Sequence, residues 1–316
     1  MGYQVIRTAK AAFLYPVALF AAPALAQDGA ADPVIGNEPV RHAAGADFFV
    51  STDADNTEVY RAGVNLDAHY RGQEQYWGVR LEKAWYRPLG QKTVSKERAY
   101  LRYADKSGGW AWSGQVGTDG DTVLGAASIH NNARFRQEYF VERDVVETPR
   151  GVGEGIYYTF LGGAIDLPAD DRNSVTLMAG AQEFTGKNVR LHVRANYVHA
   201  LKPEWGLSAQ LRTRYFHSTE PGEYDYYSPR WFAQLLPVLQ LRRHAGGWRY
   251  LAAGGIGAQR DSASGWRSSR FLAVEVASPI VDHRWFVKAG AQYSNTPFRT
   301  GAYDYLQVSV ALTTAF

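Results

Sequence analysis

The fold is decided by Leu306-Gln307-Val308-Ser309-Val310-Ala311-Leu312-Thr313-Thr314-Ala315-Phe316, the last stretch of the sequence. Even-numbered positions from 306 to 312 are apolar, odd-numbered positions hold Gln, Ser, Ala and Thr, and the stretch ends on an aromatic ring. Because successive side chains of a β-strand point to opposite faces, this period of two predicts a strand with one apolar and one polar face. A tilted strand needs about 9–11 residues to cross a bilayer, whereas globular strands average about 5–6, so the length favours a membrane-spanning strand.

The same alternation recurs along the chain, for example over 60–70, 189–197 and 207–215. Bacterial transmembrane barrels have an even number of antiparallel strands. We therefore predict an all-β fold, a transmembrane antiparallel up-and-down β-barrel of about sixteen strands, with fourteen or eighteen also compatible. The expected strands are 46–52, 57–70, 74–86, 96–104, 109–118, 122–130, 133–143, 155–166, 173–183, 187–200, 206–217, 230–242, 247–260, 266–278, 284–294 and 303–316.

The connections between these strands alternate in length. Short, turn-rich connections such as 71–73 and 131–132 alternate with longer ones such as 144–154 and 218–229. In bacterial barrels the short turns lie on the periplasmic side. The C-terminus is therefore expected on the periplasmic side, and the expected location is the outer membrane of a Gram-negative bacterium.

The first 26 residues form a segment of a different kind. Arg7 and Lys10 precede an apolar core, and Ala24-Leu25-Ala26 offers small residues at both positions that a signal peptidase reads. This order predicts a signal peptide over 1–26. Residues 27–45, rich in Ala, Gly, Pro and Asp, are expected to be a flexible periplasmic lead-in, and residues 46–316 the barrel.

Composition narrows the function classes. The chain has 34 Lys plus Arg and 31 Asp plus Glu, a net charge of +3, so nucleic acid is not an expected partner. Cysteine is absent, which excludes a thiol nucleophile, a thiolate zinc site and a disulfide. Aromatic residues make up 14% of the chain, and rings with a polar edge suit a membrane–water interface. We expect no cofactor and no metal.

The alternation also assigns faces. A charge that faces lipid at mid-membrane costs on the order of 2–4 kcal/mol, so the polar face should point into the barrel. Two hypotheses explain the inward charges: a structural network of opposite charges, or the lining of a hydrated path for a polar solute. Lys83 and Arg270 fall on the outer face and are expected near an interface. The predicted lumen-lining residues are Arg190, His192, Arg194, Asn196, Gln210, Arg212, Arg214, Asp67, Arg80, Glu82 and Glu275.

Two motifs and the ending resemble a known family. Over 183–190, Glu-Phe-Thr-Gly-Lys-Asn-Val-Arg resembles the C-terminal barrels of outer-membrane exopolysaccharide exporters, such as the cellulose-export channel and the poly-N-acetylglucosamine export porin. Over 226–232, Tyr-Tyr-Ser-Pro-Arg-Trp-Phe resembles the family's Tyr-Ser-Pro start of a late strand. The ending is similar too, and the likeness spans 145–316. The tetratricopeptide repeats that usually precede the family's barrel have no match in this sequence.

The resemblance implies a pore that passively conducts a secreted exopolysaccharide through a polar, charge-lined lumen. Many weak contacts suit such transport better than tight binding. Because sugars often stack on rings, we predict a stacking patch at the outer mouth, with an ordinary aromatic girdle as the alternative. The predicted sugar-stacking residues are Tyr224, Tyr226, Tyr227, Trp231 and Phe232. A general or solute-selective porin is the second functional hypothesis.

The expected partners follow from the predicted location and the resemblance. They are outer-membrane lipid and lipopolysaccharide, the barrel-assembly machinery, which favours a terminal aromatic residue, and a polysaccharide. A separate periplasmic protein is a further possible partner, in place of the missing repeats.

A barrel enzyme or a structural barrel is the third and most distant hypothesis. Neither G-x-S-x-G nor H-E-x-x-H occurs in the sequence. His217 with Ser218 is the best candidate for a catalytic pair. Glu220, Glu223 and Asp225 offer paired carboxylates or calcium ligands. Because no fuller catalytic constellation occurs, we predict that the protein is not an enzyme.

Overall fold

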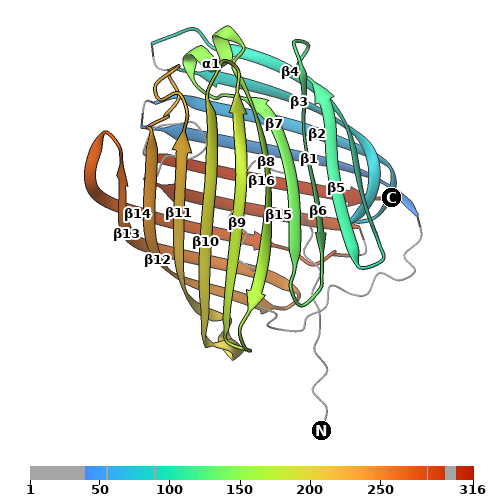
Figure 1. The fold of residues 1–316 in the computed structure, drawn as a ribbon. Coiled ribbons are helices and arrows are strands. Elements are labelled where there is room, and N and C mark those ends of the chain that lie inside the picture. Colours follow the sequence, from blue (N-terminus) through green and yellow to red (C-terminus); the bar gives the residue numbers. More distant parts are fainter. Residues whose placement is uncertain (1–39, 55, 89, 283, 296–303) are drawn as a thin grey trace.

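The computed structural model describes residues 40–316 except 55, 89, 283 and 296–303. Sixteen strands form one closed sheet, in which each strand pairs with its neighbours in the chain and β16 pairs with β1 (Figure 1). The strands are β1 (Arg41–Asp53), β2 (Glu58–Gly72), β3 (Gln75–Arg87), β4 (Val94–Ser107), β5 (Trp110–Thr118), β6 (Val123–Asn131), β7 (Gln137–Val145), β8 (Tyr157–Pro168), β9 (Asn173–Phe184), β10 (Val189–Lys202), β11 (Leu207–Ser218), β12 (Trp231–Ala245), β13 (Trp248–Asp261), β14 (Ser264–Ala277), β15 (Trp285–Ser294) and β16 (Tyr305–Ala315).

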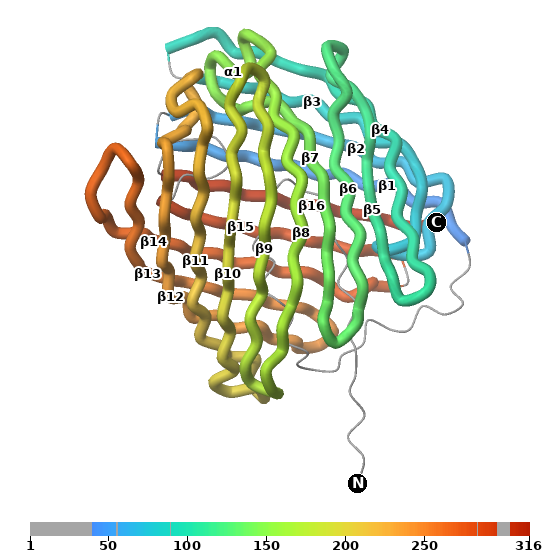
Figure 2. The backbone as a smooth tube through the Cα atoms, viewed as in Figure 1, coloured from blue at the N-terminus to red at the C-terminus, as the bar shows by residue number. Residues whose placement is uncertain are grey.

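The predicted fold class is confirmed. Neighbouring strands are antiparallel throughout the sheet. Figure 2 shows the strands of the near wall, β6–β11, crossing those of the far wall, β13–β16, at a steep angle. Strands on opposite sides of a barrel cross in this way because each strand is tilted against the barrel axis.

The two ends of the described chain close the sheet. β1 pairs with β16 over eleven positions, from Ala43 opposite Ala315 to Asp53 opposite Tyr305. At the end of this ladder His42 and Phe316 exchange backbone hydrogen bonds of 3.1 and 2.9 Å. The stretch 306–316 therefore forms the strand that completes the barrel.

The lead-in is shorter than the sequence predicts. β1 begins at Arg41, so residues 41–45 belong to the sheet and not to a flexible segment. The Ala- and Gly-rich composition of this stretch hides the strand, because small residues give little apolar alternation. The backbone of β16 nevertheless pairs with it. The predicted signal peptide, 1–26, lies outside the described residues.

Exposure alternates along the strands as the period of two requires. On β10, Leu191 is 53% exposed and Val193 57%, whereas Arg190 and His192 are 1% and 3% exposed. The outward face is therefore apolar and the inward face polar. No helix within the described ranges is long and apolar enough to cross a membrane.

The two basic residues on the outer face lie at different places along their strands. Lys83, near the end of β3, donates to Glu97 at 2.9 Å. Arg270 is level with the end of β15, where its backbone N–H donates to Asn295 at 2.6 Å. Arg270 is nevertheless near the middle of its own strand, β14, so its place near an interface stays a prediction.

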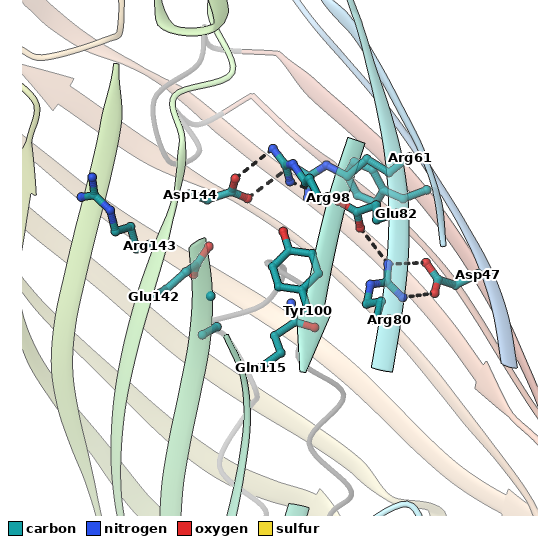
Figure 3. Close-up of a pocket in the computed structure, with 13 residues that line it drawn as sticks. Asp47, Arg61, Arg80, Glu82, Arg98, Tyr100, Gln115, Glu142, Arg143 and Asp144 are labelled. Carbon is teal, nitrogen blue, oxygen red and sulfur yellow. Dashed lines mark hydrogen bonds and ion pairs between the residues drawn. The ribbon is translucent and has the colours of Figure 1, made fainter. Parts of the chain in front are cut away.

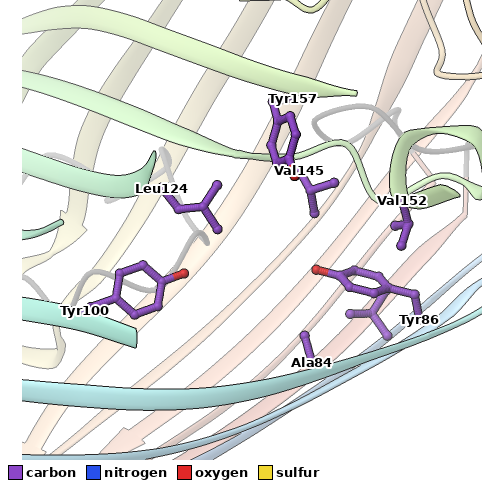
Figure 4. Packing of buried hydrophobic residues seen from close by; sticks show 8 residues of the cluster. Ala84, Tyr86, Tyr100, Leu124, Val145, Val152 and Tyr157 are labelled. Atoms are coloured by element: carbon purple, nitrogen blue, oxygen red, sulfur yellow. The ribbon is translucent and has the colours of Figure 1, made fainter. Parts of the chain in front are cut away.

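One short helix, α1 (Pro149–Glu154), interrupts the connection between β7 and β8. Thr148 caps its first turn, since Thr148 Oγ1 accepts a hydrogen bond from Gly151 N at 3.1 Å. Gly155 ends it in the left-handed conformation at φ +72°, where glycine is favoured. Val152 of this helix packs against inward side chains of the strands (Figure 4). This cluster contains Val59, Ala84, Tyr86, Tyr100, Leu124, Val145 and Tyr157.

Candidate functional site: two charged walls of the lumen

One wall of the interior carries a network of ion pairs (Figure 3). Arg80 binds the Asp47 carboxylate, donating from Nη2 to Oδ2 at 2.8 Å, and also donates to Glu82 at 2.7 Å. Arg98 bridges Glu82 and Asp144, with a distance of 3.1 Å to each carboxylate. Arg98 is only 3% exposed, so its charge depends on these acids for compensation.

The network continues to the end of β7. Arg61 lies 3.8 Å from the Asp144 carboxylate and pairs with Glu147 in the β7–β8 connection. Acids and cations alternate through the whole network, so each charge is matched by a neighbour. We call these residues the ion-pair wall: Asp47, Arg61, Arg80, Glu82, Arg98, Asp144 and Glu147.

A polar cavity of about 70 Å³ adjoins the ion-pair wall (Figure 3). Tyr100, Gln115, Glu142 and Arg143 are among the further residues that line it. One ordered water needs about 10–15 Å³ of such volume, so the cavity has room for several water molecules. This side of the lumen is therefore suited to hydration.

A different charge pattern occurs on the opposite side of the barrel. β11 lies eight strands from β3 in the closed order, and β10, β11 and β12 contain no Asp or Glu. Basic side chains occupy the buried, inward face of β10 and β11. In the register, Arg194 lies directly opposite Arg214. We call the following residues the basic wall: Arg190, His192, Arg194, Arg212 and Arg214.

Aromatic rings hold Arg190 at the end of the basic wall that lies near Tyr227. Its guanidinium carbon lies 4.5 Å from the centre of the Phe216 ring and 5.0 Å from that of Phe184. Its Nη2 also donates to the backbone oxygen of Tyr227 at 2.5 Å. A guanidinium over aromatic faces is attracted by their quadrupoles, so Arg190 is fixed in place.

The two sequence motifs that carry the family resemblance contact each other in space. The rings of Phe184, from 183–190, and Tyr226, from 226–232, stack with centres 4.3 Å apart. Asn188 is fully buried, and its Nδ2 donates to the Tyr226 hydroxyl at 2.9 Å. Burial raises the pKa of Tyr226 to about 12, so the phenol stays neutral and keeps this contact.

Carboxylates anchor the β11–β12 connection, 219–230, to neighbouring connections at the same end of the barrel. Glu223 accepts hydrogen bonds from the backbone N–H groups of Lys187 at 2.7 Å and Asn188 at 3.0 Å. Asp225 accepts from Thr148 Oγ1 at 2.7 Å and from the backbone N–H of Arg150 at 2.8 Å. The connection is thereby tied both to the β9–β10 turn and to α1.

Replacing Asn188 with Ala should loosen this connection. The change removes the hydrogen bonds to the Tyr226 hydroxyl and from Glu220 N, at 2.9 and 3.1 Å. Removing one partner of a buried hydrogen bond costs about 1–3 kcal/mol. We expect tryptic cleavage at the exposed Arg230 to be at least about tenfold faster, since about 1.4 kcal/mol corresponds to a factor of ten when cleavage follows local opening.

Lys187 provides the matched control, because its backbone N–H donates to Glu223 of the connection while its side chain is exposed. Lys187→Ala should leave the cleavage rate at Arg230 unchanged. Equal cleavage of both variants would show that Asn188 does not anchor the connection.

Two predicted lumen-lining residues lie apart from both walls. Asp67 of β2 pairs with Arg102 at 3.3 Å. Glu275 of β14 pairs with Arg249 at 3.3 Å and with Lys288 at 3.1 Å. Asp67 is thus matched by a cation two strands away, across β3, and Glu275 by cations on both neighbouring strands, which favours the structural network hypothesis for them. Their contact with a solute stays a prediction.

The structure brings the residues predicted to stack on sugars into two pairs and leaves one apart. The ring centres of Tyr224 and Tyr226 are 6.2 Å apart, and those of Tyr227 and Phe232 are 6.3 Å apart. Trp231 precedes Phe232 on β12 and therefore faces the other side of the sheet. Tyr226 and Phe232 are 2% and 0% exposed, so their faces pack against protein. Stacking on a sugar stays a prediction for this set.

The enzymatic alternatives find no geometric support. Adjacent positions on β11 place His217 and Ser218 on opposite faces, and Ser218 is fully buried with Arg190 Nε 3.4 Å from its hydroxyl. Glu223 and Asp225 are engaged by the hydrogen bonds described above. Within the described part of the chain, no group of three or more His, Cys, Asp or Glu residues is placed to hold a metal.

Sequence reasoning missed three acids of the ion-pair wall as site residues. Asp47 lies near the start of the weakly alternating first strand, while Asp144 and Glu147 fall where a loop is expected. Their partners come from strands 33 or more positions away along the chain, such as Arg80 for Asp47. The one signal in the sequence is that inward cations outnumber inward acids in 61–102, which predicts acidic partners from other parts of the chain.

The fold and the polar, charged interior define the class: a closed sixteen-stranded barrel of the type found in bacterial outer membranes. No family model and no curated protein matches the sequence.

Solved structures give the comparison in detail. The chain is similar to a bacterial polysaccharide outer membrane secretin, with a TM-score of 0.64 and 13% identity, covering 86% of this chain and 98% of that chain. It is also similar to OccK5 (OpdH) of Pseudomonas aeruginosa, with a TM-score of 0.42 and 10% identity over 88% and 99%. The KdgM porin in complex with disordered oligogalacturonate has a TM-score of 0.37 and 7% identity over 86% and 99%. All three identities are below 25%, so these likenesses concern the fold.

Proposed function

We propose that the protein is an outer-membrane conduit through which a secreted polysaccharide passes. The observation that carries this proposal is the likeness to the polysaccharide secretin, 98% of whose chain is covered at a TM-score of 0.64. The apolar outer face fits a lipid environment, and the polar inner face fits a hydrated path.

The inward side chains supply the contacts that a sliding sugar chain needs. Sugars carry many hydroxyl groups, which both donate and accept hydrogen bonds, and side-chain amides can match either role. Conduction requires many weak contacts and no single tight one. Inward amides occur on four successive strands, β9–β12, at Gln182, Asn196, Gln210, Gln234 and Gln240.

The polar cavity beside the ion-pair wall favours a second candidate function. A space of about 70 Å³ lined by charges suits water and small polar solutes. A solute-selective porin is therefore the alternative to a polysaccharide conduit.

Planar-bilayer conductance, combined with oligosaccharide block, separates these functions. A conduit should give stable ion-conducting steps that oligosaccharides of increasing length block with increasing residence time. A porin for small solutes should conduct without such length-dependent block. A barrel that inserts but never conducts would overturn both functions.

The orientation of the barrel is part of the proposal. The long connections 146–156 and 219–230 lie at one end, while the short turns such as 169–172 and 246–247 lie at the other, together with both ends of the described chain. We place the long connections outside the cell and the C-terminus in the periplasm.

Cysteine labelling tests this orientation cleanly, because the chain has no Cys. Glu220→Cys lies in a long connection and Asp171→Cys in a short turn at the opposite end, and both positions are exposed. A membrane-impermeant maleimide should label the first variant in intact cells and the second only after lysis. The reverse pattern would show that the C-terminus faces outward.

A further inference from the structure

We propose that the basic wall binds the carboxylate groups of an acidic polysaccharide, a chain of uronic-acid type, as it moves through the barrel. This inference rests on the proposed conduit function and adds that the transported polysaccharide is anionic. Arg194, Arg212 and Arg214 are the assigned contact residues. Arg190 has a positioning role, because three aromatic rings and a backbone carbonyl already hold it.

The first observation is the absence of acids across a broad part of the wall. β10, β11 and β12 carry no Asp or Glu, and the single acid of β9, Glu183, is on the exposed outer face. On the opposite side of the barrel, every cation of the ion-pair wall lies against an acid. Among the described strands, basic side chains therefore outnumber acidic ones on one side of the barrel, where an anion is attracted.

The second observation is a cross-strand pair of like charges. Arg194 of β10 is directly opposite Arg214 of β11, and Asn196 is directly opposite Arg212. Side chains opposite each other have Cβ atoms about 4.5–5.5 Å apart, and like charges in such pairs destabilise a sheet. A carboxylate between the two guanidinium groups would relieve this repulsion and accept hydrogen bonds from both.

The third observation is a set of buried polar atoms that face the same part of the wall. His192 Nδ1 and Asn196 Oδ1 make no hydrogen bond with the described residues, although the two side chains are 3% and 8% exposed. Buried polar atoms in folded proteins nearly always have a hydrogen-bond partner. Beside the guanidinium groups, they offer a donor or acceptor for the hydroxyl groups of a sugar.

The surroundings select a sugar acid over a small mineral anion. Gln210 lies next to Arg212 and accepts from its Nε at 3.0 Å, and Gln182 lies 3.2 Å from His192. Amides and guanidinium groups thus alternate along the wall, as hydroxyls and carboxylates alternate along a polyuronate. Burial strengthens each charged contact because the local dielectric constant is lower than that of water.

Open-channel block in planar bilayers tests the proposal with three probes of similar length. Oligogalacturonate is anionic, malto-oligosaccharide is neutral, and deacetylated chito-oligosaccharide is cationic. We expect oligogalacturonate to block at concentrations at least about tenfold lower than the other two, as one charge-assisted hydrogen bond corresponds to about a factor of ten or more.

Substitutions then assign the block to the basic wall. Arg194→Gln and Arg212→Gln should each raise the blocking concentration of oligogalacturonate about tenfold and leave block by malto-oligosaccharide unchanged. Arg102→Gln, at a cation matched by Asp67 on another strand, is the control and should leave both unchanged. Arg212→Lys keeps the charge and should retain most of the block. Folding of each variant is checked by the heat-dependent mobility of the barrel in gels.

Calorimetric titration of the detergent-solubilised barrel with the same three probes separates failure of this inference from failure of the conduit. Binding of oligogalacturonate by a barrel that does not conduct would overturn the conduit and support the binding wall. A conducting barrel that binds and is blocked equally by neutral and anionic probes would overturn the inference and leave the conduit intact. Preference for the cationic probe would also overturn the inference.

Discussion

Replacing Arg98 with Met is expected to destabilise the barrel by about 3–5 kcal/mol, the usual cost of removing one partner from a buried ion pair. Arg98 lies 3.1 Å from both Glu82 and Asp144 and donates to the Tyr86 hydroxyl at 2.5 Å. Met fills a similar space without charge, so the change leaves carboxylates that are 8% and 11% exposed without their central cation. The free energy of unfolding from lipid vesicles, followed by tryptophan fluorescence, measures the effect.

Lys83→Met is the matched control on the neighbouring strand. Lys83 also pairs with an acid, Glu97, but the two side chains are 43% and 79% exposed. Ion pairs at such exposure contribute about 0–1 kcal/mol. If both variants lost the same free energy of unfolding, the ion-pair wall would not stabilise the barrel through burial.

Replacing Val310 with Arg is expected to cost about 2–4 kcal/mol of unfolding free energy, because an arginine at mid-membrane must leave water for hydrocarbon. Val310 is 45% exposed on the outward face of β16, near the middle of the strand. Leu306 is 44% exposed on the same face and is the second residue of the strand, which begins at Tyr305. Leu306→Arg should therefore cost only about 0–1 kcal/mol, since its charge can reach the interface.

Unfolding titrations of both variants in vesicles of one lipid provide the measurement. The difference between them depends on depth alone, because strand, face and substitution are the same. Equal costs at both positions would mean that the outer face of β16 does not meet the hydrocarbon of a bilayer.

The fold could be predicted from the sequence because two properties of a membrane strand are local. Alternation and length can both be read within about ten residues, and they identified all sixteen strands to within a few residues at most ends. β1 is the exception, since its first residues include Ala43, Ala44 and Gly45, whose side chains are too small to show a face. The partner strand, β16, fixes that segment through its backbone.

The site was only partly predictable, because alternation shows which side chains point inward but not which residues they form ion pairs with. Arg80 and Glu82 were expected to point inward, yet the Asp47 that binds Arg80 lies two strands away, across β2. Contacts between side chains on strands that are two apart depend on how far the strands are shifted along each other and on side-chain length. The two-residue alternation of the sequence shows neither. The contact between Phe184 and Tyr226 is hidden for the same reason, as it depends on how a long connection folds back.

The meeting of β1 with β16 has a consequence for how the chain reaches the membrane. Ala43 and Ala315 are opposite each other, so the sheet becomes a cylinder only when β16 has reached β1. Before that moment it has two open edges, and each unpaired backbone group in hydrocarbon costs several kcal/mol. The barrel should therefore close in one step, when β16 pairs with β1. A chain that stops before Tyr305 should be degraded or aggregate in the periplasm rather than persist as an open sheet of fifteen strands.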